Sequence, residues 1–236
     1  WLESLSHRTG TPLLLGAVFT RLSPLDGEEL WFNGAFTVDP RGGLQDPGYA
    51  KRKLVPFGEY VPLRPIIGWI EKFVPIGGDF QPGYDEQPLA LTAGGRSVSV
   101  GALICYEDIF PGLARASVKQ GAEVLAVLTN NAWFGEGGAA YQHAAHSVLR
   151  AVENRRPLLR VGNGGWSGWI DEYGHIRDTA IGTDGTVYFR GHRTVEITRD
   201  ERWRGRASVY TQRGDWFVLV CGLFAILGYY LVRPLR

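Results

Sequence analysis

Seventeen consecutive apolar or aromatic residues without a charge lie near the end of this chain, in the run WFVLVCGLFAILGYYLV from Trp216 to Val232. A run of this length is at the short end of what a helix needs to cross a membrane. Trp216 at one end, and Tyr229 and Tyr230 near the other, fit the aromatic residues that gather at the two faces of a bilayer. The run predicts one C-terminal transmembrane helix; the alternative is a helix buried in the core of a domain.

The rest of the chain reads as one α/β domain, because apolar strand patterns alternate with helical ones through its centre. We therefore divide the chain into a domain over residues 1–210 and a helix with a short tail over residues 211–236. A formal net charge of +1 and the lack of a basic run exclude a nucleic-acid partner of the usual kind. Strands are expected at 13–19, 30–38, 49–57, 97–105, 123–129, 158–161, 166–170, 185–189 and 194–198, and helices at 111–120 and 139–155.

The chain begins at Trp1 and contains no Met, and its first residues have the spacing of the middle of a helix. No signal peptide precedes them. We therefore expect this sequence to be the C-terminal part of a longer protein.

Cys105 follows the apolar run VGALI, and two carboxylates follow it in CYED. A strand that leads into a turn and then a helix is a common way to expose a reactive side chain, and the helix predicted to begin near Pro111 would direct its N-terminus at this turn. A thiol near a helix N-terminus or a cation ionises more readily, and the thiolate is the nucleophile. The alternative is a buried cysteine without a chemical role.

The stretch KRKLVPFGEYVPL, from Lys51 to Leu63, is the second group of chemical interest. A lysine beside a thiolate can stabilise both the thiolate and the oxyanion that forms when it attacks a carbonyl, while Glu59 can hold its partners in place. The alternative is a solvated basic patch at the edge of a strand.

Three stretches together resemble the nitrilase superfamily, and within it the apolipoprotein N-acyltransferase branch. They are LVPFGEYVPL, ICYEDIFPG and LTNNAWFG, which begin at Leu54, Ile104 and Leu128. The stretch from His143 to Asp171, and YTQRGDW before the apolar run, are also similar to that branch. The resemblance implies an αββα sandwich, a Glu–Lys–Cys triad and one last transmembrane helix.

Transferred position by position, the resemblance makes Cys105 the nucleophile and Lys51 the triad lysine. Glu59 and Glu107 become supporting carboxylates of the catalytic site, and no metal or cofactor is implied. Tyr106 is an active-site neighbour, and the loop residues expected to line the substrate pocket are Asn130, Asn131, Trp133 and Phe134. Asp108 has no role in this scheme, and we expect it to be a solvated loop residue.

The triad glutamate of the superfamily lies in a Pro-Glu motif upstream of the first strand, and this sequence has no such motif. Glu3 lies too close to that strand to replace it. We therefore expect the general base, and a membrane domain of several helices, outside these 236 residues. By itself this chain is expected to be inactive.

The implied reaction moves an acyl chain from a phospholipid to the N-terminal diacylglyceryl-cysteine amine of an apolipoprotein, through a thioester on Cys105. The implied location is the bacterial inner membrane, with the catalytic domain on the periplasmic side and the C-terminus in the cytoplasm. The alternatives are a membrane-tethered amidase of the same superfamily and a membrane-anchored binding domain without activity.

Three other features have weaker interpretations. His143 and His146 share one face of a helix, but without further ligands a zinc site is a minor alternative. The run GNGGWSG, from Gly162 to Gly168, lacks the strand-then-helix setting of a phosphate loop and predicts a turn. The apolar segment from Leu63 to Ile76 is expected to be a membrane-dipping arm above the pocket; the alternative is ordinary core.

Overall fold

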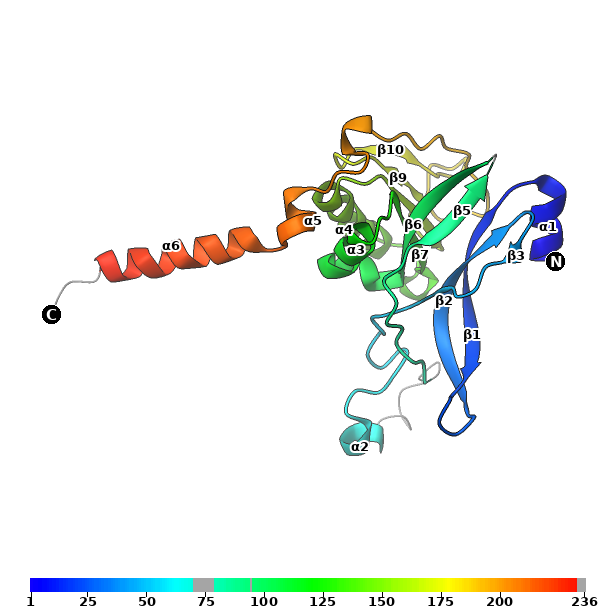
Figure 1. The fold of residues 1–236 in the computed structure, drawn as a ribbon, viewed down its shortest axis with the longest axis horizontal. Coiled ribbons are helices and arrows are strands. Elements are labelled where there is room, and N and C mark those ends of the chain that lie inside the picture. The colour runs from blue at the N-terminus through cyan, green and yellow to red at the C-terminus, as the bar shows by residue number, and fades with distance from the viewer. Residues whose placement is uncertain (70–78, 94, 233–236) are drawn as a thin grey trace.

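Two β-sheets form the body of the molecule in a computed structural model that describes residues 1–69, 79–93 and 95–232 (Figure 1). The first sheet has the order β1-β2-β3, with β4 also paired to β2, and the second has the order β10-β9-β8-β7-β6-β5. Strands β6, β7 and β8 are parallel and the other pairs are antiparallel. The strands are β1 (Leu13–Leu22), β2 (Glu29–Asp39), β3 (Gly43–Leu44), β4 (Tyr49–Ala50), β5 (Leu89–Ala93), β6 (Arg96–Ile104), β7 (Val124–Asn130), β8 (Leu158–Asn163), β9 (Gly168–Ile170) and β10 (Ile176–Thr179).

Helices pack on the second sheet and at the ends of the chain. Helices α3 and α4 pack against β6 and β8, whereas α1 contacts β2 and β3. The α-helices are α1 (Leu2–Thr9), α2 (Arg64–Ile67), α3 (Pro111–Lys119), α4 (Ala139–Asn154), α5 (Val209–Arg213) and α6 (Trp216–Val232). Short 3-10 helices are η2 (Cys105–Ile109), η3 (Ala132–Phe134) and η4 (Glu201–Trp203).

Strand β6 is apolar along its second half because it is covered on both faces. Ala102 and Ile104 join Ala35 of β2 in the core between the two sheets. Leu103, pointing the other way, joins Leu113 of α3 in the core beneath the helices. Burial on both faces produces a continuous apolar run rather than an alternating one. The two cores hold β6 in place, so the residue that follows it has a fixed position.

Most of the predicted elements are present, but the strand expected over 49–57 is wrong. Strand β4 ends after Ala50, because the N–H groups of Arg52 and Lys53 donate to the side chain of Glu107 instead of to a neighbouring strand. The sequence also gave no indication of β5, which follows a proline-rich stretch.

The strands expected over 185–189 and 194–198 are wrong as well. This segment has no strand pairing. Val187 is buried in the core beneath the helices, and the segment is also held by ion pairs from Arg193 to Asp178 at 3.0 Å and from Arg199 to Glu123 at 2.8 Å. The strand that pairs with β9 is β10 instead.

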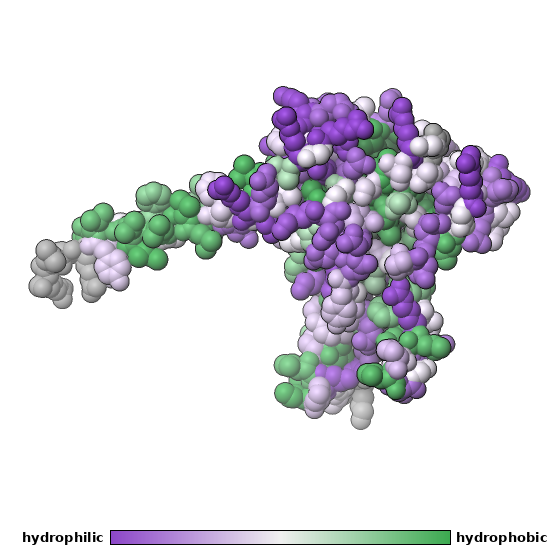
Figure 2. Space-filling model, viewed as in Figure 1, coloured by the Kyte–Doolittle hydropathy of each residue, from purple (hydrophilic) through white to green (hydrophobic). Residues whose placement is uncertain are grey.

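The C-terminal apolar run forms α6, which projects away from the body of the molecule (Figure 1). None of its residues is buried, so the alternative of a helix in the domain core is wrong. The space-filling view shows its apolar side chains in the open (Figure 2). Among the residues that the structure describes, no helix is both long enough and apolar enough to qualify as a membrane span.

The segment expected to be a membrane-dipping arm is described only as far as Trp69. Its remaining residues, up to 76, lie outside the described residues. Within the described part, Leu63, Ile66 and Trp69 are exposed around the short helix α2, with 72% of Ile66 accessible. The turn between β1 and β2 exposes Leu22 and Leu25. Figure 2 shows apolar side chains at this end of the molecule.

Candidate active site

The turn that follows β6 places Cys105 at the carboxyl end of a buried parallel strand. Cys105 has a φ of 54°, in the left-handed region that residues with a side chain rarely adopt. It is the first residue of η2 rather than the last residue of the strand, and it is partly exposed. A strained backbone of this kind persists only where the surroundings hold it. The turn thus presents the thiol at the edge of the sheet, as a nucleophile requires.

Lys51 lies directly after β4 and is 1% exposed. Its Nζ is 2.8 Å from both carboxylate oxygens of Glu59 and 5.3 Å from the centre of the Tyr106 ring. The ring belongs to the residue after Cys105, so the ammonium group lies beside the turn that carries the thiol. An ammonium held in this way is suited to bind the negative charge of a developing oxyanion. The solvated basic patch considered from the sequence is wrong for Lys51.

Glu59 is fully occupied by donors of the protein. Besides Lys51, it accepts hydrogen bonds from the side-chain amide of Asn33 at 2.6 Å and from the backbone N–H of Val55 at 2.8 Å. These bonds fix the carboxylate between the first sheet and the loop that follows Lys51. Glu59 therefore orients the lysine and is not free to act as a general base.

Glu107 is completely buried and joins three parts of the site. One oxygen accepts from the N–H groups of Arg52 at 2.7 Å and Lys53 at 3.0 Å, and the other accepts from Tyr49 Oη and Ile104 N, both at 2.8 Å. Burial raises the pKa of this carboxyl, and the four hydrogen bonds oppose that effect. Glu107 thus ties the segment around Lys51 to the end of β6, and it positions the site rather than facing a substrate.

Tyr106 fills the space between Lys51 and the helix layer. Its hydroxyl donates to the carbonyl of Leu54 at 2.5 Å, and its ring packs edge-on against Phe110 at 5.2 Å. Burial raises the pKa of this phenol to about 12, so it stays a hydrogen-bond donor at neutral pH.

The expectation for Asp108 is wrong, because this residue is fully buried rather than solvated. Its carboxylate contacts the Arg160 guanidinium at 2.6 Å, the Ser147 hydroxyl at 2.7 Å and the His143 ring at 3.0 Å. Burial raises the pKa of Asp108, but the bond from His143 and the charge of Arg160 outweigh this and lower the pKa below its usual range. His143 therefore contacts a carboxylate of the turn, which gives no support to its role in a zinc site with His146.

The loop after β7 lies beside the Cys105 turn, because β6 and β7 are parallel and Ile104 pairs with Leu128. Asn131 is buried and its Oδ1 accepts from the Thr129 hydroxyl at 2.8 Å. Asn130 Oδ1 accepts from Ala132 N at 3.2 Å and Asn163 Nδ2 at 3.1 Å. The two asparagines therefore shape the loop.

Trp133 and Phe134, at the tip of this loop in η3, are exposed, with 85% of Trp133 accessible. The run 162–168 contains a turn, as predicted, between the end of β8 and the start of β9, and it packs against the loop. A Cβ on Gly165 would lie 2.9 Å from Asn131 Cβ, so only glycine allows this close approach.

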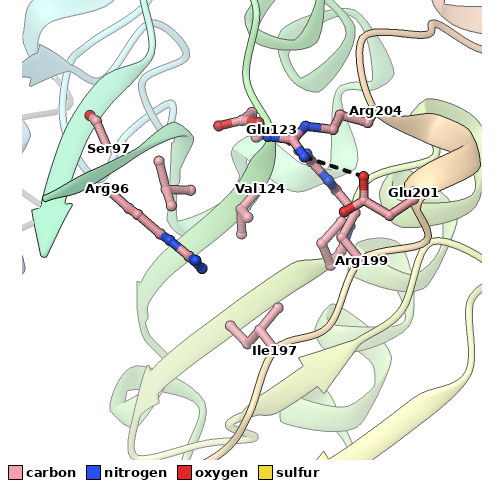
Figure 3. A pocket seen from close by; sticks show the side chains of 10 residues that line it. Arg96, Ser97, Glu123, Val124, Ile197, Arg199, Glu201 and Arg204 are labelled. Atoms are coloured by element: carbon pink, nitrogen blue, oxygen red, sulfur yellow. Dashed lines mark hydrogen bonds and ion pairs between the residues drawn. The ribbon is translucent and has the colours of Figure 1, made fainter. Parts of the chain in front are cut away.

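A cleft of about 570 Å³ lies at the opposite edge of the second sheet, where β6 and β7 begin. Figure 3 shows its charged side chains, with Arg204 joined to Glu201. Arg199 likewise pairs with Glu123. Because this cleft lies at the other end of the strand from Cys105, it is separate from the candidate active site.

The sequence did not point to Arg160, Ser147 or Tyr49 as residues of the site. The available signal was Arg160 itself, a charged residue within the apolar strand β8, since a buried charge requires a partner.

A family model of carbon–nitrogen hydrolases matches residues 1–194. The chain belongs to the carbon–nitrogen hydrolase family. Curated relatives are named apolipoprotein N-acyltransferase. The Geobacter metallireducens protein is 48% identical over 201 residues, which cover 83% of this chain and 35% of the relative. The Thermotoga maritima protein is 32% identical over 201 residues, covering 85% of this chain and 37% of the relative. The chain thus spans about a third of the length of the curated relatives it matches.

The fold is similar to that of a solved amidase of the nitrilase superfamily from Nesterenkonia sp. AN1. One structure of this amidase has a TM-score of 0.52 and 23% sequence identity, over 76% of this chain and 62% of the amidase. In that structure, acrylamide has added to the active-site cysteine of the amidase. The nitrilase-like α/β fold inferred from the sequence is therefore confirmed.

Proposed function

We propose that this chain is the catalytic domain of an apolipoprotein N-acyltransferase, with Cys105 as its nucleophile. The observation that carries the proposal is the pairing of a strained Cys105 turn with a buried Lys51 ammonium beside it. This chain is more similar to a protein named apolipoprotein N-acyltransferase, at 48% identity over 83% of its length, than to the amidase, at 23% identity over 76%. This difference favours a transferase over an amidase.

In the first half of the reaction, the Cys105 sulfur attacks the carbonyl carbon of a phospholipid ester. The negative charge moves to the carbonyl oxygen, where the Lys51 ammonium stabilises it. When the tetrahedral intermediate collapses, the ester C–O bond breaks. A lysophospholipid leaves with the proton that the thiol has given up, and the acyl chain stays on Cys105 as a thioester.

In the second half, the free amine of the N-terminal diacylglyceryl-cysteine of an apolipoprotein attacks the thioester carbonyl. Lys51 stabilises the oxyanion again, the C–S bond breaks, and an amide forms. The amine loses a proton and the thiol regains one, so the enzyme returns to its starting state. No cofactor takes part in either half.

The general base is a carboxylate other than those around the turn. Glu59, Glu107 and Asp108 each accept hydrogen bonds from several protein donors, so none of the three is free to take the thiol proton. We place the base in a segment outside these 236 residues.

We also propose that the domain faces a bilayer. Helix α6 presents 17 uncharged residues, none of them buried, and at the usual rise of a helix it is roughly 26 Å long, close to the thickness of a bilayer core. Leu63, Ile66 and Trp69 form the described part of a lipid-dipping arm. The proposed location is the bacterial inner membrane, with the domain outside and the C-terminus in the cytoplasm.

The test is to incubate the complete gene product with phospholipid vesicles and to search for an acyl adduct by mass spectrometry. We expect the adduct on the peptide that contains Cys105, and its loss when a diacylglyceryl-cysteine peptide is added. Cys221, the other cysteine of this chain, lies in α6 and should carry no adduct, which makes it an internal control for non-specific acylation. Transfer activity that survives in Cys105→Ala would refute the assignment of the nucleophile.

The acceptor is tested in the same experiment. Release of free fatty acid at an equal rate with and without the peptide would indicate a hydrolase with water as acceptor. Binding of phospholipid without any adduct would indicate a binding domain.

A further inference from the structure

A cluster of buried polar side chains lies on the helix side of the Cys105 turn, away from Lys51, and the proposed chemistry does not use it. Arg160 pairs in register with Val127 of β7, which pairs with Leu103 of β6, and Leu103 belongs to the core beneath the helices. Asp108 and Arg160 are both completely buried.

One face of α4 is directed at this turn. His143, Ser147 and Arg150 have the spacing i, i+4 and i+7, which places them on one side of a helix. His143 and Ser147 contact the Asp108 carboxylate, while Arg150 Nη1 donates to the Asp108 carbonyl at 3.0 Å. A carboxylate only accepts hydrogen bonds, so the His143 Nε2 that contacts it carries a proton. Helix α4 thus holds the turn through both the side chain and the backbone carbonyl of Asp108.

Close packing alone does not explain why this cluster contains a buried ion pair. A buried ion pair loses the hydration of both partners, and apolar residues of similar size often stabilise a protein as well or better. A fully buried arginine three residues into an apolar strand is therefore weak as a stabilising device. Its place next to the nucleophile turn suggests that its charge and its hydrogen bonds serve the site.

Arg160 has bonding capacity beyond Asp108. Its Nη1 donates to Asp108 and to the Ser147 hydroxyl, at 2.6 and 3.0 Å, whereas its Nε and Nη2 have no hydrogen-bond partner among the residues that the structure describes. Burial lowers the pKa of Arg160, and the negative charges of Asp108 and of a Cys105 thiolate raise it.

We propose that Asp108 and Arg160 are positioning residues for Cys105, which hold its turn in the left-handed conformation. This inference rests on the proposed function, in which Cys105 is the nucleophile. Glu107 holds the turn from the side between the sheets, and the pair holds it from the side of the helices. The left-handed φ of Cys105 then persists because the residues two and three positions beyond it are anchored in opposite layers.

The experiment compares Asp108→Asn, Arg160→Met and the double variant in the complete gene product. Each single variant leaves one buried partner unmatched, so a lower melting temperature is expected. The double variant removes both charges and should recover most of the lost melting temperature. The decisive readout is the rate at which iodoacetamide alkylates Cys105, divided by the rate for free N-acetylcysteine in the same buffer.

We expect this ratio to fall at least tenfold in the double variant although the fold is restored, and kcat for acyl transfer to fall while KM for phospholipid stays unchanged. Arg160→Lys, which retains the charge, should recover more than half of the ratio. A double variant with the wild-type ratio and kcat would overturn the proposal and leave the pair a purely structural feature.

A matched control uses the same two substitutions at a surface pair, Asp178→Asn with Arg193→Met, where the ion pair at 3.0 Å is partly exposed. This control should leave the ratio unchanged. Should the double variant of the buried pair fail to fold, Ser147→Ala removes one donor to Asp108 and one acceptor for Arg160 without removing either charge. It is expected to lower the ratio about threefold, and an unchanged ratio there would also overturn the proposal.

Failure of the proposed function gives a different result. In that case Cys105→Ala retains acyl transfer, while the alkylation ratio still responds to the pair.

Discussion

Replacement of Glu107 by Gln tests the idea that one buried carboxylate holds Lys51 and Cys105 together. The two oxygens of Glu107 accept four hydrogen bonds, from Arg52 N, Lys53 N, Tyr49 Oη and Ile104 N. Gln has the same shape but only one acceptor oxygen. If that oxygen keeps the hydrogen bonds from Arg52 N and Lys53 N, the new side-chain NH₂ group faces Tyr49 Oη and Ile104 N. The Tyr49 hydroxyl can rotate and accept a hydrogen bond from this NH₂ group. The Ile104 N–H can only donate, so it loses its partner.

The expected loss follows from these bonds. An unsatisfied buried N–H costs about 1–3 kcal/mol, and each bond that changes from charged to neutral weakens by about 1 kcal/mol. Burial raises the pKa of Glu107, which means that the charged form is costly to bury, and the neutral Gln avoids part of this cost. The net decrease in the free energy of unfolding is about 2–4 kcal/mol. For a protein of this size it corresponds to a decrease of roughly 4–16 °C in melting temperature.

Thermal and urea unfolding measure this decrease, and acyl transfer measures its consequence for the site. Glu86→Gln is the matched control, because Glu86 contacts Arg52 at 3.2 Å from a half-exposed position. Such a surface pair contributes about 0–1 kcal/mol, so the control should unfold as the wild type does. A Glu107→Gln variant that melts within about 2 °C of the wild type would refute the reasoning. It would mean that Glu107 is already protonated, and Gln would then be a close substitute.

Lys51→Arg should lower acyl transfer nearly as much as Lys51→Ala, by about 100- to 1000-fold, because a guanidinium is larger and directs its charge differently; retained activity, together with loss in Lys53→Arg, would identify Lys53 as the catalytic lysine. Asp108 has a lowered pKa in the folded state, so its stabilising contribution is complete above about pH 4 and is lost as the pH falls through the folded-state pKa. In urea unfolding between pH 2 and 6, Asp108→Asn should therefore show a smaller loss of stability on acidification, and a slope equal to that of the wild type would contradict this. Gly101→Ala should decrease the free energy of unfolding by about 1–3 kcal/mol, because the added Cβ would lie 2.9 Å from Ser117 Cβ in α3. Gly112→Ala, where nothing lies within 4 Å, is its control, and equal stability of the two variants would exclude close packing at Gly101.

The sequence alone was sufficient for the elements whose signal is local. The hairpin of β1 and β2, the strands β6 and β7 and the helices α3 and α4 were predicted from apolar spacing, turn residues and the proline at a helix start. Cys105 and Lys51 could also be proposed as site residues from the sequence, because each lies in a short local motif. These features depend on residues within a few positions of one another.

Only the tertiary structure assigned the carboxylates. Glu107 and Asp108 are adjacent in the sequence and equally acidic, yet one binds the segment around Lys51 and the other binds Arg160. Their partners lie 55 and 52 residues away in the chain, and no local pattern indicates which layer each side chain enters. The same long-range bonds explain why β4 has only two residues. The N–H groups of Arg52 and Lys53 donate to Glu107 instead of to a neighbouring strand. A buried charge binds whichever groups the packing of distant elements brings within reach, so its role is determined by the fold and not by its neighbours in the sequence.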